Sequence, residues 1–304
     1  DLLVRDCQFW NGGNELTGAE GSVAALHNNL FVRSGLGAFA DASSTLTLSN
    51  NLVRHAEVVL LNQDNANLWR IHNNAFDHCA VSSLFTPLTN SHNAYINCDG
   101  RLNPTNINNV VLTNFTYASG PLGDYYHASA NLRNVGSTDA YSAGLFHYTT
   151  SASQVMETNS VVDLGFHYMS LTNGVVPDSD ADGIPDYLDA DSDGNDGLPD
   201  WWEQKYMGHL AETPDGDYDG DCVTNLLEYL QGTNPAELPS VASYPVYQIL
   251  PIGANATFSV SGNPGCVKYQ WYKNNELIPG ATNTSLTLNA VQLASNAMYR
   301  ADAY

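Results

Sequence analysis

A repeat of about 22 residues runs through the first 120 positions and restricts the possible folds more than any other feature of the chain. Six segments align on one polar column, with gaps of 22, 22, 23, 19 and 21 residues. The column contains Cys7, Asn29, Asn51, Asn74, Asn93 and Asn114. A unit of this length has no core of its own, so equivalent units must stack on one another.

Neighbouring columns keep the same register. The third position before the asparagine is mostly aliphatic, from Val4 to Val111, and the second position after it is mostly aromatic or apolar, from Phe9 to Thr116. The fifth position after it is always small: Gly12, Ser34, Ala56, Cys79, Cys98 and Ser119. This alternation predicts short β-strands stacked at ~4.8 Å. Stacked asparagine amides are expected to bond along the column and to adopt the left-handed conformation of a tight bend.

The pattern resembles right-handed parallel β-helix proteins of the pectate-lyase-like class, and we predict this fold for residues 1–172. A leucine-rich horseshoe is the alternative for such a period, but its dense leucine spacing is absent. The segments "GLFHYTT" and "LGFHYMS", which contain His147 and His167, are predicted to form the last coils or the cap that closes the open sheet edges.

The resemblance implies an enzymatic alternative, because many β-helix proteins cleave acidic polysaccharides with Arg or Lys, or with paired aspartates. The arginines of the repeat region do not share a column and its acids form no adjacent pair. His27 and His72 do share one, which suits either an imidazole-lined groove or ordinary solvent-facing residues. A polysaccharide lyase or glycoside hydrolase whose active site lies upstream of this sequence remains the alternative function.

Cys79 and Cys98 occupy the small column in adjacent coils, so their Cα atoms are expected to lie within the ~4.4–6.8 Å range of disulfides. A disulfide and two buried thiols both fit this placement. The five cysteines do not follow a zinc-binding spacing.

Acidic residues are concentrated in one part of the chain. Sixteen of the 32 acids lie between Asp178 and Glu228, where Lys205 is the single Lys or Arg, and the net charge is −22. Such a segment repels nucleic acid and anionic lipid and favours divalent cations. Since no run of eighteen apolar residues occurs, we expect no membrane span.

The spacing D-x-D-x-D-G-I-x-D-x-x-D predicts a first calcium loop of the EF-hand type, in which carboxylates converge from one short segment. Gly183 is predicted to form its sharp turn. Its predicted ligands are Asp178, Asp180, Asp182, the carbonyl of Ile184, Asp186 and Asp189.

Two more loops follow the first. One has an extra residue in its front half, and its predicted ligands are Asp189, Asp191, Asp193, Asp196, Asp200 and Glu203. The other has Cys222 where glycine is expected, and its predicted ligands are Asp217, Asp219, Asp221, the carbonyl of Val223, Asn225 and Glu228. A solvated acidic linker is the alternative, but a linker would not repeat D-G-[IL]-P-D.

Residues 176–235 resemble thrombospondin type-3 and dockerin-like calcium repeats of secreted proteins, which implies Ca²⁺ as the bound ion and an extracellular location. Helices are predicted over Pro199–Tyr206 and Thr224–Gln231. Their predicted core consists of Trp201, Trp202, Tyr206, Leu226, Leu227 and Tyr229, with a carbohydrate platform as the alternative role of the two tryptophans.

Residues 236–244 are predicted to be a linker, and 245–304 resemble an incomplete immunoglobulin-like sandwich. The resemblance rests on alternating strands, Trp271 and a Tyr299 placed as a tyrosine corner. Val260 and Ala301 occupy the positions of the missing inter-sheet disulfide.

The predicted fold is therefore mainly β, with a parallel β-helix, a small calcium module with two short helices, and an incomplete sandwich. The predicted function is that of an extracellular calcium-binding protein that is adhesive or contacts carbohydrate, with polysaccharide or cell-surface components as partners. Calcium is expected to stiffen the joint between its domains.

Overall fold

The computed structural model describes residues 1–18, 20–40, 43–62, 68–84, 88–102, 108–158, 160–194, 196–221, 223–237, 241–243, 247–262 and 268–303. Within this part the chain forms two compact units, Asp1–Asp189 and Ala190–Tyr304. The boundary between them lies inside the predicted calcium module. Cys222, Cys266 and part of the predicted linker lie outside the described residues.

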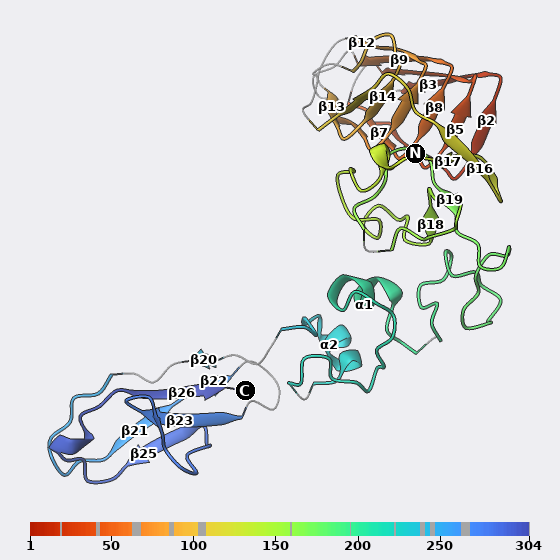
Figure 1. Ribbon diagram of the computed structural model, residues 1–304. Helices are drawn as coiled ribbons and strands as arrows, with labels where there is room; N and C mark the ends of the chain where they lie inside the picture. The colour runs from red at the N-terminus through yellow and green to blue at the C-terminus, as the bar shows by residue number, and fades with distance from the viewer. Residues whose placement is uncertain are drawn as a thin grey trace. The chain divides into compact units, whose positions relative to one another are not determined.

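The first unit is a parallel β-solenoid, as the repeat predicts (Figure 1). Each of the first four coils supplies one strand to each of three sheets, and the last strands extend the first and middle sheets alone. The first sheet contains β1 (Leu2–Arg5), β4 (Val23–His27), β7 (Thr45–Ser49), β10 (Leu68–His72) and β13 (Leu88–Ser91). The middle sheet contains β2 (Gln8–Trp10), β5 (Leu30–Val32), β8 (Leu52–Arg54), β11 (Ala75–Asp77), β14 (Ala94–Ile96) and β15 (Val110–Leu112). The third sheet contains β3 (Gly13–Gly18), β6 (Gly35–Ala40), β9 (Glu57–Asn62) and β12 (Ala80–Leu84).

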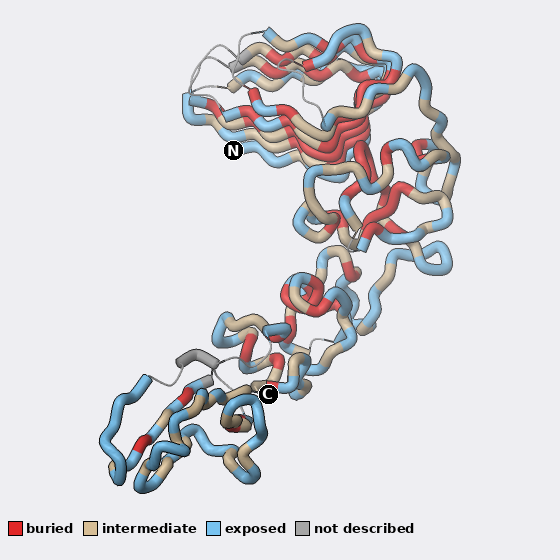
Figure 2. Tube along the Cα trace, turned by 60° about the vertical axis from the view of Figure 1, so that its left-hand side comes forward, coloured by how far each residue is buried: buried red, intermediate tan, exposed pale blue. Residues whose placement is uncertain are grey.

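Inward side chains of the three sheets form the solenoid core. The aliphatic column Leu26, Leu48 and Ile71 is in register and fully buried. Phe9 stacks on Phe31 with ring centres 4.8 Å apart. Equivalent residues of successive coils therefore lie on top of one another. Figure 2 shows the resulting stripes of buried residues along the stacked turns.

Cys79 and Cys98 are free thiols, which decides between the two alternatives left open by their spacing. The Cys79 thiol donates to the carbonyl of Val53 at 3.1 Å. The Cys98 thiol donates to the carbonyl of Phe76 at 3.1 Å. Each sulfur is therefore bonded to the backbone of the coil before it.

A buried asparagine ladder fills the corner between the first and middle sheets. Asn29 donates its backbone N–H and its amide to Asn51 Oδ1, at 2.9 and 3.0 Å. Asn51 bonds to Asn74 and Asn74 to Asn93 in the same two ways. Every rung thus satisfies the rung before it, which confirms the predicted bonding along the column.

Two details of the predicted ladder are wrong. The last coil is shorter, so Asn93 donates to Asn109, which directly precedes β15, and Asn114 lies outside the column. Val111, Thr116 and Ser119 therefore leave the columns assigned to them. The left-handed residue is also not the rung but the residue before it, with φ values of 52–60° in Asp6, Asn28, Asn50, Asn73 and His92. The residue before each rung thus makes the backbone bend, and the rung residue makes the amide hydrogen bonds.

This second column of left-handed asparagines binds the segment that follows the solenoid. Asn28 Oδ1 accepts the backbone N–H of His167 at 2.7 Å, and its amide donates to the His167 carbonyl at 3.0 Å. Asn73 Oδ1 accepts the N–H of Ser137 at 2.8 Å. Leu30 and Leu52 point outward from the middle sheet but are buried, because this segment covers them.

The covering segment contains β16 (Tyr117–Gly120), β17 (Gly123–His127), the 3₁₀ turn Ala130–Leu132, β18 (Tyr148–Thr149) and β19 (Tyr168–Met169). β18 and β19 carry the two similar "HY" motifs, yet they pair antiparallel. The prediction that they continue the coils is wrong, since successive coils are parallel. The segment covers an apolar outer face rather than a sheet edge.

The second unit contains two short helices and several small antiparallel sheets. The helices are α1 (Asp200–Tyr206) and α2 (Asn225–Gln231), and no described helix is long and apolar enough to cross a membrane. The strands are β20 (Val241–Ser243), β21 (Ala256–Ser259), β22 (Ser261–Gly262), β23 (Tyr269–Lys273), β24 (Glu276–Leu277), β25 (Ser285–Leu288) and β26 (Tyr299–Ala303), with the 3₁₀ turn Leu293–Ser295.

The C-terminal sheets pack around Trp271, which is fully buried. Val260 and Ala301 belong to the same cluster, so apolar contact takes the place of the bridge expected between these positions. The Tyr299 hydroxyl donates to the carbonyl of Ser295 at 3.2 Å, the kind of bond that defines a tyrosine corner.

Candidate metal centre

Three acidic loops each bring three carboxylates together within 4.8 Å. Loop one (178–189) belongs to the first unit, while loop two (191–203) and loop three (217–228) belong to the second. The clusters are Asp178, Asp180 and Asp182; Asp191, Asp193 and Asp200; and Asp217, Asp219 and Asp221. The predicted loops therefore converge locally, as their spacing requires.

The fifth loop position has the same backbone bond in all three loops. Asp182 Oδ1 accepts the N–H of Ile184 at 2.7 Å. Asp196 accepts from Leu198 at 2.9 Å, and Asp221 accepts from Val223 at 2.8 Å. The extra residue of loop two is thus absorbed before Asp196, and the rest of that loop keeps the common geometry.

The first loop position bonds to the turn glycine in loops one and two. Gly183 donates to Asp178 at 3.2 Å and Gly197 donates to Asp191 at 2.9 Å. Both glycines have positive φ, +94° and +98°, where a β-carbon is strained. This confirms the predicted sharp turn at Gly183.

The ninth position braces each loop. Both oxygens of Asp186 accept from Ser179, from the backbone N–H and the hydroxyl, each at 2.7 Å. Asp200 accepts both groups of Ser192 at 2.7 and 2.6 Å. Asn225 Oδ1 accepts the N–H of Tyr218 at 3.1 Å. Our sequence analysis missed the two serines, although both directly follow the first aspartate of a loop.

At the twelfth position of loops two and three a glutamate is buried and has at least one carboxylate oxygen without a partner; Glu228 Oε1 accepts from the Thr233 hydroxyl at 3.3 Å. Glu203 on α1 has no exposed surface, and neither of its oxygens has a hydrogen-bond partner. Glu228 on α2 is 3% exposed, and its Oε2 has no partner either. The corresponding residue of loop one, Asp189, is half-buried.

The neighbouring aspartates make this burial more costly. Burial, followed by the negative charges of Asp193 and Asp196, raises the pKa of Glu203 to about 8. Burial together with Asp219 and Asp221 raises the pKa of Glu228 to about 7. Leaving a buried acid unpaired among like charges is unfavourable unless a cation joins them.

The donor set fits a hard divalent cation. All candidate side-chain donors are oxygens, and Ca²⁺ takes six to eight of them at ~2.3–2.6 Å. The unpartnered carboxylate oxygens of Glu203 and Glu228 lie beside the aspartates of loops two and three, as ligands of such ions would.

The helices hold these glutamates through a small aromatic core. Trp202 is 2% exposed and packs with Leu198, Met207, Tyr206, Leu226 and Tyr229. Leu227 is wrongly predicted to join this core, because it lies one position from the inward Leu226 and is exposed. Trp201 is 39% exposed and contacts Tyr229 edge-on, so only one tryptophan is available as a platform.

The predicted pair of solenoid histidines has the expected spacing. His27 and His72 each align with Ser49, one coil apart on either side. His27 Nδ1 contacts Ser49 Oγ at 2.9 Å. Burial lowers the pKa of His27 to about 4, so it is neutral at physiological pH.

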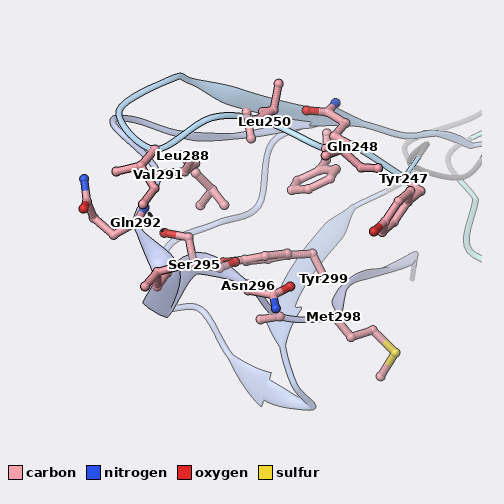
Figure 3. Close-up of a pocket in the computed structure, with 16 residues that line it drawn as sticks. Tyr247, Gln248, Leu250, Leu288, Val291, Gln292, Ser295, Asn296, Met298 and Tyr299 are labelled. Atoms are coloured by element: carbon pink, nitrogen blue, oxygen red, sulfur yellow. Dashed lines mark hydrogen bonds between the residues drawn. The ribbon is translucent and has the colours of Figure 1, made fainter.

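The second unit also has an open groove of about 470 Å³ between residues 247–252 and the start of β26 (Figure 3). Phe258, Leu288 and Tyr299 are among its apolar lining residues, and none of its sixteen lining residues is charged. None belongs to an acidic loop, so the groove and the loops are separate features.

No protein-family model, curated protein or solved structure matches this chain. The assignment of the loops therefore rests on their geometry.

Proposed function

We propose that the chain is a calcium-binding part of an extracellular protein, in which Ca²⁺ orders the acidic stretch between the solenoid and the C-terminal sheets. The single observation that carries this proposal is the burial of Glu203, with neither oxygen partnered, and of Glu228, with one oxygen unpartnered, beside clusters of aspartates. A linker in water would leave such groups exposed, so their burial supports a bound cation as their partner.

Secretion is part of the proposal, because millimolar extracellular calcium fills sites that cytosolic levels leave empty. The solenoid and the C-terminal sheets, which we infer to be immunoglobulin-like, suit an adhesive or carbohydrate-contacting role.

Calcium binding is tested with one variant for each loop. Asp182→Ala, Asp193→Ala and Asp221→Ala should each remove or weaken one site in a calorimetric titration of chelator-treated protein. Asp215→Ala, an exposed acid of the same stretch outside the clusters, is the matched control and should titrate like the parent. Unchanged stoichiometry and affinity in all three loop variants would sink the ligand assignment.

A further inference from the structure

Another column of left-handed residues, distinct from the one that contains Asn28 and Asn73, runs along the outer corner between the middle and third sheets of the solenoid. It contains Asn11, Arg33, His55, His78 and Asn97 on successive coils. The N–H of His55 donates to the Asp77 carbonyl at 2.9 Å, and that of His78 donates to Ile96 at 2.8 Å. These bonds fix the backbone, so the side chains project from defined positions one coil apart.

His55 and His78 are exposed neighbours in this column. Their ring centres are 5.0 Å apart with an angle of 46° between the planes. Two imidazoles that share a tetrahedral ion at ~2.1 Å from each nitrogen have ring centres about 5 Å apart. The spacing of the coils therefore matches the spacing of two ligands on one transition metal ion.

A buried carboxylate orients one of the two rings. Asp77 has a side chain only 1% exposed, and its Oδ1 lies 2.6 Å from His78 Nδ1 while its Oδ2 accepts from Arg54 Nε at 2.7 Å. A carboxylate at this distance assigns the proton to Nδ1 and leaves Nε2 as the lone-pair nitrogen. Histidine ligands of metals are typically held by such a carboxylate behind the ring.

We propose that His55 and His78 form a surface site for a transition metal ion that prefers imidazole, such as Zn²⁺, separate from the acidic loops. Asp77 is the positioning residue for His78, and water completes the coordination. The charge of Arg54 is offset by Asp77, whereas Arg33, exposed in the coil before His55, opposes the cation and limits its affinity.

The test is a calorimetric titration of Zn²⁺ into the full chain with the acidic loops first filled by ~5 mM Ca²⁺. We expect one saturable site, weakened at least about tenfold by His55→Gln or His78→Gln. His209→Gln, whose exposed side chain lies in the second unit, is the matched control. Arg33→Asn should strengthen binding, because it removes the opposing charge.

The positioning role of Asp77 has its own readout. Asp77→Asn should weaken zinc binding about 10- to 100-fold. The ¹⁵N chemical shifts of the His78 ring should then no longer show a single fixed tautomer. If Asp77→Asn unfolds the coil, the two histidine variants still decide the site. No saturable zinc binding, or equal binding by the His55→Gln/His78→Gln double variant, would overturn the proposal and leave two stacked surface histidines.

Discussion

The asparagine ladder and the acidic loops both bury polar side chains, but they differ in where the partners of those side chains come from. Asn29, Asn51 and Asn74 satisfy one another and the backbone of adjacent coils. Glu203 and Glu228 are as buried, yet have oxygens without a partner. The asparagine ladder is therefore satisfied within the chain, whereas the buried glutamates of the loops are the groups for which we propose a cation as partner.

Chelation is the treatment expected to separate the two regions most. Removing Ca²⁺ present at a thousand times its Kd costs ~4 kcal/mol for each ion lost. Amide hydrogen exchange should therefore speed up in α1 and α2 and stay unchanged in β5, β8 and β11. Equally accelerated exchange in both regions, or unchanged exchange in the helices, would contradict the proposed difference between the two regions.

Asn51→Ala should have the largest effect on the solenoid. It removes the acceptor of Asn29 and the donor to the Leu26 carbonyl and leaves these buried groups unpaired, which costs about 3 kcal/mol or more. Chemical denaturation with and without calcium measures the loss, which should be equal in both. Asn131→Ala, at an exposed position, should change stability by less than about 0.5 kcal/mol.

The effect of Glu203→Gln on the melting temperature should change sign with calcium. With Ca²⁺ present the variant lacks a charged ligand, and affinity at loop two should fall at least about tenfold. In chelator at pH 8 and above the variant should melt higher than the parent, because it removes a buried unpaired charge. Thermal unfolding in both buffers measures this, with the exposed Glu276→Gln as control. A lower melting temperature of Glu203→Gln in both buffers would contradict the role assigned to this carboxylate.

A pH dependence of the metal-free loops is also expected. Glu203 and Glu228 have folded pKa values of about 8 and about 7, above the ~4.3 of an unfolded chain. The folded state thus binds more protons than the unfolded state in this range, so stability in chelator should fall as pH rises from about 5 to 8. Circular dichroism melts across this range test the direction. Rising stability would show that these acids are not buried as described.

The sequence predicts features in which neighbouring residues repeat, and it misses those that depend on distant packing. Asn29, Asn51 and Asn74 recur with the same neighbours, so their column was predictable. Asn109 was missed because the last coil is only 16 residues long. The apolar, outward Leu30 and Leu52 carried a signal for a covering segment, but alternation alone did not show what covers them.

The features of the acidic loops also divide into those that the sequence predicts and those that it misses. The aspartates of each cluster are close in sequence, so their convergence followed from spacing. The burial of Glu203 and Glu228 depends on how α1 and α2 pack around Trp202, which no local pattern specifies.

Calorimetric titration of Ca²⁺ into chelator-treated, folded protein tests the central claim most directly. We expect saturable binding of two or more ions, with loops two and three filled first because their buried glutamates have oxygens without a partner. Absence of saturable heat, with the helices already protected from exchange, would contradict it and leave residues 178–228 as a solvated acidic segment.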